Sequence, residues 1–170
     1  MVLKRYALAL ALLSVSVLGL TGAHAVAAPD PDRLRAAMIF NLTKFVRWPE
    51  ESLAGSDILR LCIVGKDSVA RHLSAVDGKK VNGRTLAVEQ VTGVVGGCHV
   101  LVVGSSNVEA RPSLGMLTVG TDIDFLADGG MISIDVENNR MVFDVNLQAA
   151  RSQQLQISAE VLGLARSVRQ

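Results

Sequence analysis

The chain has 170 residues, of which 49% are hydrophobic and 19% charged, and it carries 17 Lys and Arg against 16 Asp and Glu. This length suits one domain, because folded domains typically contain about 100–200 residues. The balanced charge argues against a nucleic-acid-binding protein, which normally has a clustered positive excess. Two cysteines are too few for a disulfide-dense mini-domain or a four-cysteine zinc site.

The first 25 residues have the three-part pattern of a secretory signal peptide. Lys4 and Arg5 precede an uncharged run of 14 residues, 7–20, and small residues then place the cleavage site near Ala25 or Ala27. An uncleaved N-terminal anchor is the alternative, but the run is shorter than the ~20 residues of a comfortable membrane span. We therefore expect export and a periplasmic location.

Removal of residues 1–25 leaves 145 residues with 15 Lys and Arg against 16 Asp and Glu, a formal net charge of −1. No repeat, low-complexity segment or linker divides this remainder. We expect residues 26–170 to form a single α/β domain.

The first element of this domain is predicted to be a helix that begins at Pro31. Asp30 can cap it, proline suits the first helical position, and Trp48-Pro49 ends it because the residue before proline avoids the helical region. Apolar residues recur at spacings of three and four and predict one buried stripe. They are Leu34, Met38, Leu42 and Phe45.

Strands and short helices alternate along the middle of the chain. Apolar runs predict buried strands, and the segments between them predict short helices, which together indicate an α/β sheet with helices on both faces. The expected strands are 58–65, 84–91, 98–104 and 116–120, and the expected helices are 67–76, 106–111 and 122–127.

The pattern changes after residue 130. Segments 131–136 and 141–145 alternate between apolar and polar residues around a polar loop, which predicts a C-terminal antiparallel hairpin. Asn146 can cap a final helical stretch that is expected to break near residues 156–158.

Cys62 and Cys98 lie at or beside apolar strands, and an oxidising compartment favours a disulfide between them. It would close a 37-residue loop and contribute roughly 4 kcal/mol in the loop-entropy model. Two free buried thiols are the alternative. A metal site with His99 is disfavoured, because adjacent strand residues point to opposite faces.

The sequence offers little support for catalysis. His72 is expected at the surface and His99 in the core, and no known nucleophile, zinc or nucleotide motif is present. Asp122, Asp124 and Asp128 match a calcium loop only loosely. We therefore expect no enzyme activity, no cofactor and no metal.

The segment Arg47-Trp48-Pro49 is the strongest candidate for partner binding. Trp48 is the only tryptophan, and Trp and Arg are enriched in binding hot spots. The alternative is that Trp48 covers the core at the end of the helix. Arg140, with Arg151 downstream, is a further candidate for an anion-binding site, although both positions also suit ordinary solvated charges.

Several segments together resemble the YfiR family of periplasmic regulators. In order they are 37–49 (AMIFNLTKFVRWP), 61–65 (LCIVG), 98–102 (CHVLV), 129–133 (GGMIS) continuing into 142–147 (VFDVNL), and 156–165. Each motif is loose, but their order and spacing over residues 33–165 are fairly specific. Positions that match the pattern and suit a structural role are Pro49, Gly65, Gly129, Gly130, Phe143 and Asn146.

The resemblance implies a Rossmann-like three-layer α/β sandwich, often dimeric and without catalysis. It implies repression of an inner-membrane diguanylate cyclase through the cyclase's periplasmic region, which lowers cyclic di-GMP and biofilm formation. It also implies an outer-membrane YfiB-like lipoprotein that relieves this repression. A second cysteine pair of the best-known member is absent, with Val136 and Phe143 in that region. A periplasmic small-molecule-binding module is the alternative function.

Overall fold

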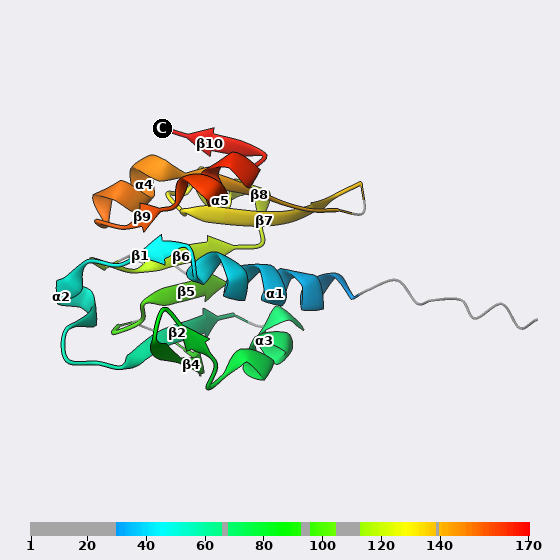
Figure 1. Ribbon diagram of the computed structural model, residues 1–170. Helices are drawn as coiled ribbons and strands as arrows, with labels where there is room; N and C mark the ends of the chain where they lie inside the picture. The colour runs from blue at the N-terminus through cyan, green and yellow to red at the C-terminus, as the bar shows by residue number, and fades with distance from the viewer. Residues whose placement is uncertain (1–29, 66–67, 93–95, 105–112, 139) are drawn as a thin grey trace, which may run out of the picture.

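The computed structural model describes residues 30–65, 68–92, 96–104, 113–138 and 140–170. The predicted signal peptide and the predicted helix at 106–111 lie outside these residues. Figure 1 shows the helices in front of one strongly twisted sheet. The helices are α1 (Pro31–Thr43), α2 (Glu50–Leu53), α3 (Ser68–Leu73), α4 (Leu147–Ser152) and α5 (Ala159–Leu164), with 3-10 turns η1 (Ser74–Val76) and η2 (Ile123–Leu126).

The main sheet has eight strands in the order β10-β8-β7-β6-β5-β2-β4-β3. Strands β4, β2, β5, β6 and β7 run parallel, whereas β3 and β8 pair antiparallel to their neighbours and β10 pairs parallel to β8. The strands are β2 (Ile58–Val64), β3 (Lys80–Val81), β4 (Arg84–Val91), β5 (Val100–Val103), β6 (Leu117–Gly120), β7 (Ile132–Glu137), β8 (Arg140–Asn146) and β10 (Ser167–Arg169).

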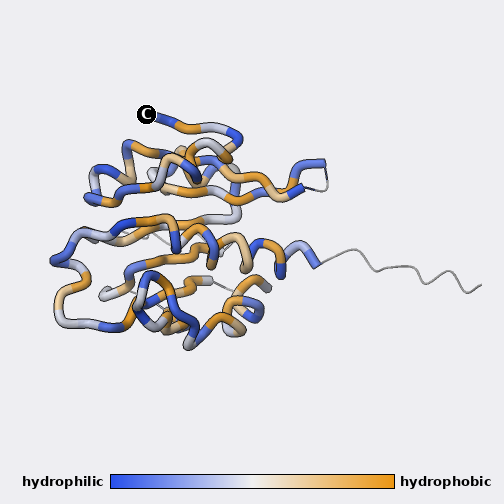
Figure 2. The backbone as a smooth tube through the Cα atoms, in the orientation of Figure 1, coloured by the Kyte–Doolittle hydropathy of each residue, from blue (hydrophilic) through white to orange (hydrophobic). Residues whose placement is uncertain are grey.

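The sequence predicted that the antiparallel pair β7–β8 would end the sheet. In the structure it does not. Strand β10 adds a further edge, with Val168 opposite Val145 in parallel register. Its three residues carry too little pattern to be recognised as a strand, because their pairing depends on β8 being in place. The order of hydrophilic turns and apolar strands that the sequence did reveal is visible along the chain in Figure 2.

Two separate apolar clusters lie on the two faces of the sheet. Leu61 and Ile63 belong to the larger cluster, together with the buried residues of α1, α3 and α5, whereas Cys62 and Val64 belong to a smaller cluster with Leu101. The alternation follows the two-residue period of a strand. Within the described part of the chain, the α-helices that join a cluster all join the larger one, and a three-layer sandwich is not confirmed.

Helix α1 is shorter than predicted, and only part of the predicted stripe is buried. Asp30 caps it by accepting a hydrogen bond from the amide of Asp32 at 3.0 Å, as expected, but it ends at Thr43 and not at Trp48. Leu34 and Phe45 are each 41% exposed. Leu42 is buried as predicted and Met38 is partly buried, but the other buried residues of the helix are Ala36, Ile39 and Thr43. The chain leaves the helix early because the following residues pair with a distant strand.

That distant pairing forms a second, two-stranded sheet. Strand β1 (Val46–Arg47) pairs antiparallel with β9 (Gln156–Ile157), so that Val46 faces Ile157 and Arg47 faces Gln156. The predicted break near residues 156–158 is therefore a strand followed by the cap of α5, where Ser158 accepts a hydrogen bond from Val161. Asn146 caps α4 as predicted, at 3.0 Å from the amide of Ala149.

The predicted disulfide between Cys62 and Cys98 is present, with 5.9 Å between the two Cα atoms. Cys62 lies on β2 and Cys98 lies just before β5, the neighbouring strand. Both half-cystines pack in the smaller apolar cluster with Met116 and, at its margin, Phe125. The bridge therefore joins two central strands on the face opposite α1 and α3.

Candidate functional site

The two-stranded sheet positions the walls of an open groove that we call the Trp48 groove. Segments 47–51 and 151–156 line it from two sides, and its volume is about 670 Å³. The β1–β9 pairing brings these segments together although about 100 residues separate them in the sequence. The lining residues are Arg47, Trp48, Pro49, Glu50, Glu51, Arg151, Gln154, Leu155 and Gln156.

Trp48 is anchored on one side and accessible on the other. Its indole Nε1 donates a hydrogen bond to the carbonyl oxygen of His99 at 3.2 Å, and its ring packs at the margin of the larger apolar cluster. The extended conformation that Pro49 imposes on the preceding residue turns the chain away from α1 and into α2. Trp48 thus covers the core, as one interpretation held, and also lines the groove.

His99 connects the backbones behind Trp48. Its ring Nδ1 accepts a hydrogen bond from the amide of Arg60 at 2.9 Å, which leaves Nε2 to donate to the carbonyl oxygen of Ser52 at 3.0 Å. Burial lowers the pKa of this imidazole, and the positive charges of Arg60 and Arg84 lower it further against the opposing effect of the Ser52 bond. The neutral ring is therefore a fully hydrogen-bonded core histidine, as the sequence predicted.

Two backbone positions of the site, Gly115 and Gln154, have no clear sequence signal. Gly115 has φ +72° and donates to the carbonyl oxygen of Gln153 at 3.1 Å. A Cβ at Gly115 would lie 2.6 Å from the Ser52 side chain, so only glycine fits between α2 and α4 there. Gln154, on the groove wall, also has positive φ (+59°), which is uncommon for a residue other than glycine.

The groove has charge of both signs at its rim. Arg47, Arg151, Glu50 and Glu51 are exposed, and none takes part in an ion pair with another described residue. Exposed charges of this kind contribute little to stability. They remain accessible to a partner surface of complementary charge.

Arg140, the third predicted partner-binding residue, does not belong to the groove. It opens β8 and faces Glu137 on β7, whereas the groove wall follows the other end of β8 through α4. A seven-residue strand is about 20 Å long. The structure therefore brings Arg47, Trp48 and Arg151 together and leaves Arg140 at the far tip of the β7–β8 hairpin.

The remaining motif positions have structural environments. Phe143 is buried in the larger cluster, Gly65 and Gly129 have positive φ, and Gly130 packs against Phe125. The hypothesised calcium ligand Asp122 caps η2 by accepting from the amide of Asp124 at 3.1 Å. Within the described residues no group of three His, Cys, Asp or Glu side chains is placed to hold a metal ion.

No helix in the described segments is long and apolar enough to cross a membrane. A family model described as YfiR/HmsC-like matches residues 32–166. A solved structure described as a conserved domain protein from Vibrio cholerae O1 biovar eltor str. N16961 matches with 12% sequence identity and a TM-score of 0.47. That match covers 82% of this chain but only 60% of the other.

Proposed function

Because the chain belongs to the YfiR/HmsC-like family, we propose that it is a periplasmic regulator that represses an inner-membrane diguanylate cyclase. In this proposal the exported domain binds the periplasmic region of the cyclase, which lowers cyclic di-GMP and biofilm formation. Such a protein acts by binding and performs no catalysis, in keeping with the regulatory character of the family.

The observation that carries the proposal is the composition of the Trp48 groove. An anchored tryptophan with two arginines in one hollow has the residue types that dominate binding energy at protein interfaces. The indole is held by the His99 carbonyl group, so little side-chain freedom is lost when a partner covers it. The exposed carboxylates of Glu50 and Glu51 give the same surface a charge pattern that selects among partners.

The experiment compares charge reversals on and off the groove. A strain that lacks the gene is complemented with the parent, with the Arg47→Glu/Arg151→Glu double variant, or with Arg140→Glu, and cyclic di-GMP is quantified. We expect the double variant to leave cyclic di-GMP as high as in the deletion strain. Arg140→Glu is the matched control, an exposed arginine reversed outside the groove, and should restore the parental level.

Capture of membrane proteins on the purified protein tests the partner directly. The cyclase should be retained by the parent and by Arg140→Glu, and lost with the double variant. Unchanged cyclic di-GMP on deletion of the gene, or capture that is insensitive to the groove substitutions, would sink the proposal.

The family resemblance motivates two further partners, a YfiB-like outer-membrane lipoprotein and a second copy of the chain. Light scattering during gel filtration should give the mass of a dimer. The lipoprotein should displace the cyclase from the captured protein in a dose-dependent way if it relieves repression by competition.

A further inference from the structure

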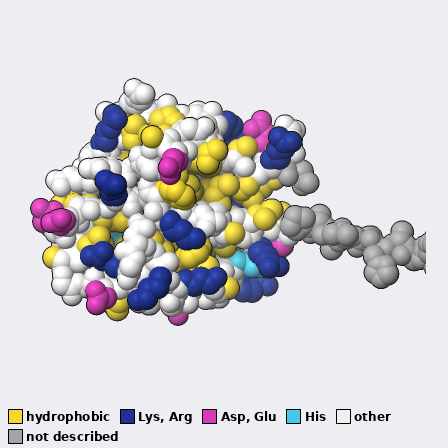
Figure 3. Space-filling model, viewed as in Figure 1, with side chains coloured by type: hydrophobic (Ala, Val, Ile, Leu, Met, Phe, Trp, Pro, Cys, Tyr) yellow, Lys and Arg dark blue, Asp and Glu magenta, His cyan; other side chains and the backbone are white. Residues whose placement is uncertain are grey.

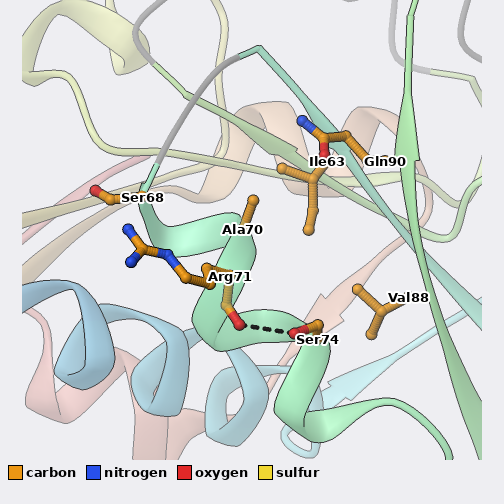
Figure 4. Close-up of a pocket in the computed structure, with 7 residues that line it drawn as sticks. All are labelled: Ile63, Ser68, Ala70, Arg71, Ser74, Val88 and Gln90. Carbon is orange, nitrogen blue, oxygen red and sulfur yellow. Dashed lines mark hydrogen bonds between the residues drawn. The ribbon is translucent and has the colours of Figure 1, made fainter.

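A second hollow lies between α3 and the last residues of β4, away from the Trp48 groove (Figure 4). Its floor is apolar, with Ile63 from β2, Ala70 from α3 and Val88 from β4. Ser68, Arg71, Ser74 and Gln90 surround the floor, and the volume is about 670 Å³. Helix α3 forms a stable wall because it packs along α1 and His72 pairs with Asp30 at 3.0 Å.

The direction of the β4 backbone groups can be read from their partners. Thr85 donates toward β2, to the carbonyl oxygen of Asp57 at 2.7 Å, whereas Leu86 exchanges bonds of 2.8 Å with Lys79 and Gly78 on the opposite side. Backbone groups alternate in direction along a strand. The backbone N–H and C=O groups of the even-numbered residues of β4 therefore point away from β2, toward the edge of the sheet.

This edge is covered at its start and open at its end. Strand β3 pairs only with Arg84 and Thr85, and the carboxylate of Asp77 accepts the amide of Val88 at 2.9 Å. Among the described residues, no backbone group bonds the carbonyl oxygen of Val88 or the amide and carbonyl of Gln90. One donor and two acceptors thus face outward beside the apolar floor.

The charge around this edge is mostly positive. Figure 3 shows Lys and Arg side chains gathered over the part of the molecule where α3, β3 and β4 lie. Arg71, Lys79 and Lys80 are exposed and form no ion pair with any described residue. Of the nearby carboxylates, Asp77 is engaged by the amide of Val88, and Glu89 points to the opposite face, 3.9 Å from Arg60. Asp32 on α1 accepts hydrogen bonds from Ser68 and from Arg35, so its charge is also engaged.

We propose that residues 88–91 of β4 and the adjacent face of α3 form a docking site for an extended, acidic segment of a partner protein. The segment adds to the sheet as a further strand through Val88 and Gln90, the recognition mode known as β-augmentation. Its alternate side chains enter the hollow over Ile63, Ala70 and Val88, and its acidic residues face the cations of α3 and of the loop before β3. This site is independent of the Trp48 groove.

The test is selection of binding peptides from a random heptapeptide phage library on the purified protein. We expect enrichment of sequences that alternate apolar and polar residues and contain Asp or Glu. Synthetic copies are then measured by fluorescence polarisation against the parent, Gln90→Ala and Gln90→Pro. Proline removes the outward amide at an edge position that tolerates it, and alanine keeps that amide.

Gln90→Pro should weaken binding by about tenfold or more, as expected for a lost hydrogen bond and a displaced strand. Gln90→Ala, which keeps the amide but alters the rim of the hollow, should weaken binding much less than Gln90→Pro does. A peptide N-methylated at alternate amides should lose binding to the unaltered protein, which keeps the test valid if Gln90→Pro does not fold. Arg71→Ala/Lys79→Ala should abolish the preference for acidic residues. Absence of enriched peptides, or binding that tolerates both the proline and the N-methyl groups, would overturn the proposal.

Discussion

Trp48 donates its indole N–H to the carbonyl oxygen of His99, a residue 51 positions later in the sequence. The same carbonyl oxygen also accepts the amide of Leu117 at 2.8 Å. Trp48, which lines the groove, is therefore attached to the point where the central strands β5 and β6 begin. The binding role that we propose for the groove and the stability of the sheet therefore both involve this contact.

Two replacements of Trp48 separate the contribution of this hydrogen bond to stability from that of the ring's packing. Trp48→Phe keeps a large aromatic ring but removes the donor, and we expect a loss of about 1 kcal/mol in the free energy of unfolding. Trp48→Ala also removes the packing against the larger cluster and should cost about 3 kcal/mol. Urea unfolding followed by circular dichroism measures both. A Trp48→Phe variant as stable as the parent would show that the hydrogen bond contributes nothing.

His99 should make stability depend on pH. Its pKa is lowered in the folded protein, so below about 6.5, the ordinary value, the unfolded chain binds more protons than the folded one. The contribution of the neutral His99 to the free energy of unfolding is therefore complete above pH 6.5 and is lost progressively as the pH is lowered below that value. Protonation of Nδ1 would also remove the bond from the amide of Arg60.

Urea titrations at pH 7.5 and 5.5 measure this effect. His99→Gln should be less stable than the parent at pH 7.5 but should lose less on acidification. His72→Gln, which alters a partly exposed histidine paired with Asp30, is the control for histidine content. Equal pH dependence of stability in the parent and in His99→Gln would show that His99 does not cause the loss of stability at low pH.

Removal of the disulfide should destabilise the fold without opening the groove. The Cys62→Ser/Cys98→Ser variant loses a cross-link that closes a 37-residue loop, which is worth roughly 4 kcal/mol in the loop-entropy model. The expected result is a lower urea midpoint, and dithiothreitol should reproduce it in the parent. Titration of two free thiols in the native, unreduced protein would contradict the bridge.

Much of the main sheet was predictable because β2, β4 and β5 have long apolar or alternating runs whose signal is local. The pairs β1–β9 and β8–β10 were not, since strands of two or three residues acquire their conformation from partners far away in the chain. For the same reason the candidate site could be predicted only in part. The sequence identified Arg47, Trp48 and Arg151 separately, but only the β1–β9 pairing joins them and excludes Arg140.

The C-terminal strand should depend on Arg166. Its guanidinium bonds the carboxylate of Asp144, which lowers the pKa of that group, and reaches Glu137 at 3.1 Å and Asp135 at 3.7 Å. Arg166→Gln would leave three carboxylates facing one another on β7 and β8. Because the network is partly solvated, we expect a loss within about 1 kcal/mol.

Hydrogen exchange gives a sharper measurement of this change than global unfolding. The amides of β10 should exchange faster in Arg166→Gln, whereas those of β2 and β5 should not change. Arg140→Gln, at the start of the same strand pair but outside the ion network, is the matched control. Equal protection of β10 in both variants would show that backbone pairing with β8 suffices.

Gly129 and Gly130 are adjacent, but the structure requires glycine at each for a different reason. Gly129 has φ +88° with open space where a Cβ would stand, so a side chain costs only backbone strain. A Cβ at Gly130 would lie 2.3 Å from the ring of Phe125, which packs at the margin of the smaller apolar cluster, and 2.6 Å from the backbone carbonyl oxygen of Phe125. Gly130→Ala must therefore displace this ring and also shift the local backbone.

We accordingly expect Gly129→Asn to lower the free energy of unfolding by no more than about 1 kcal/mol, since asparagine tolerates the left-handed region. Gly130→Ala should cost about 1–3 kcal/mol, the usual penalty of overpacking, and Gly130→Ala/Phe125→Ala should cost less than the two single substitutions added together. Urea unfolding of the parent, Gly130→Ala, Phe125→Ala and the double variant measures this coupling. Additive losses would show that the Phe125 ring does not restrict position 130.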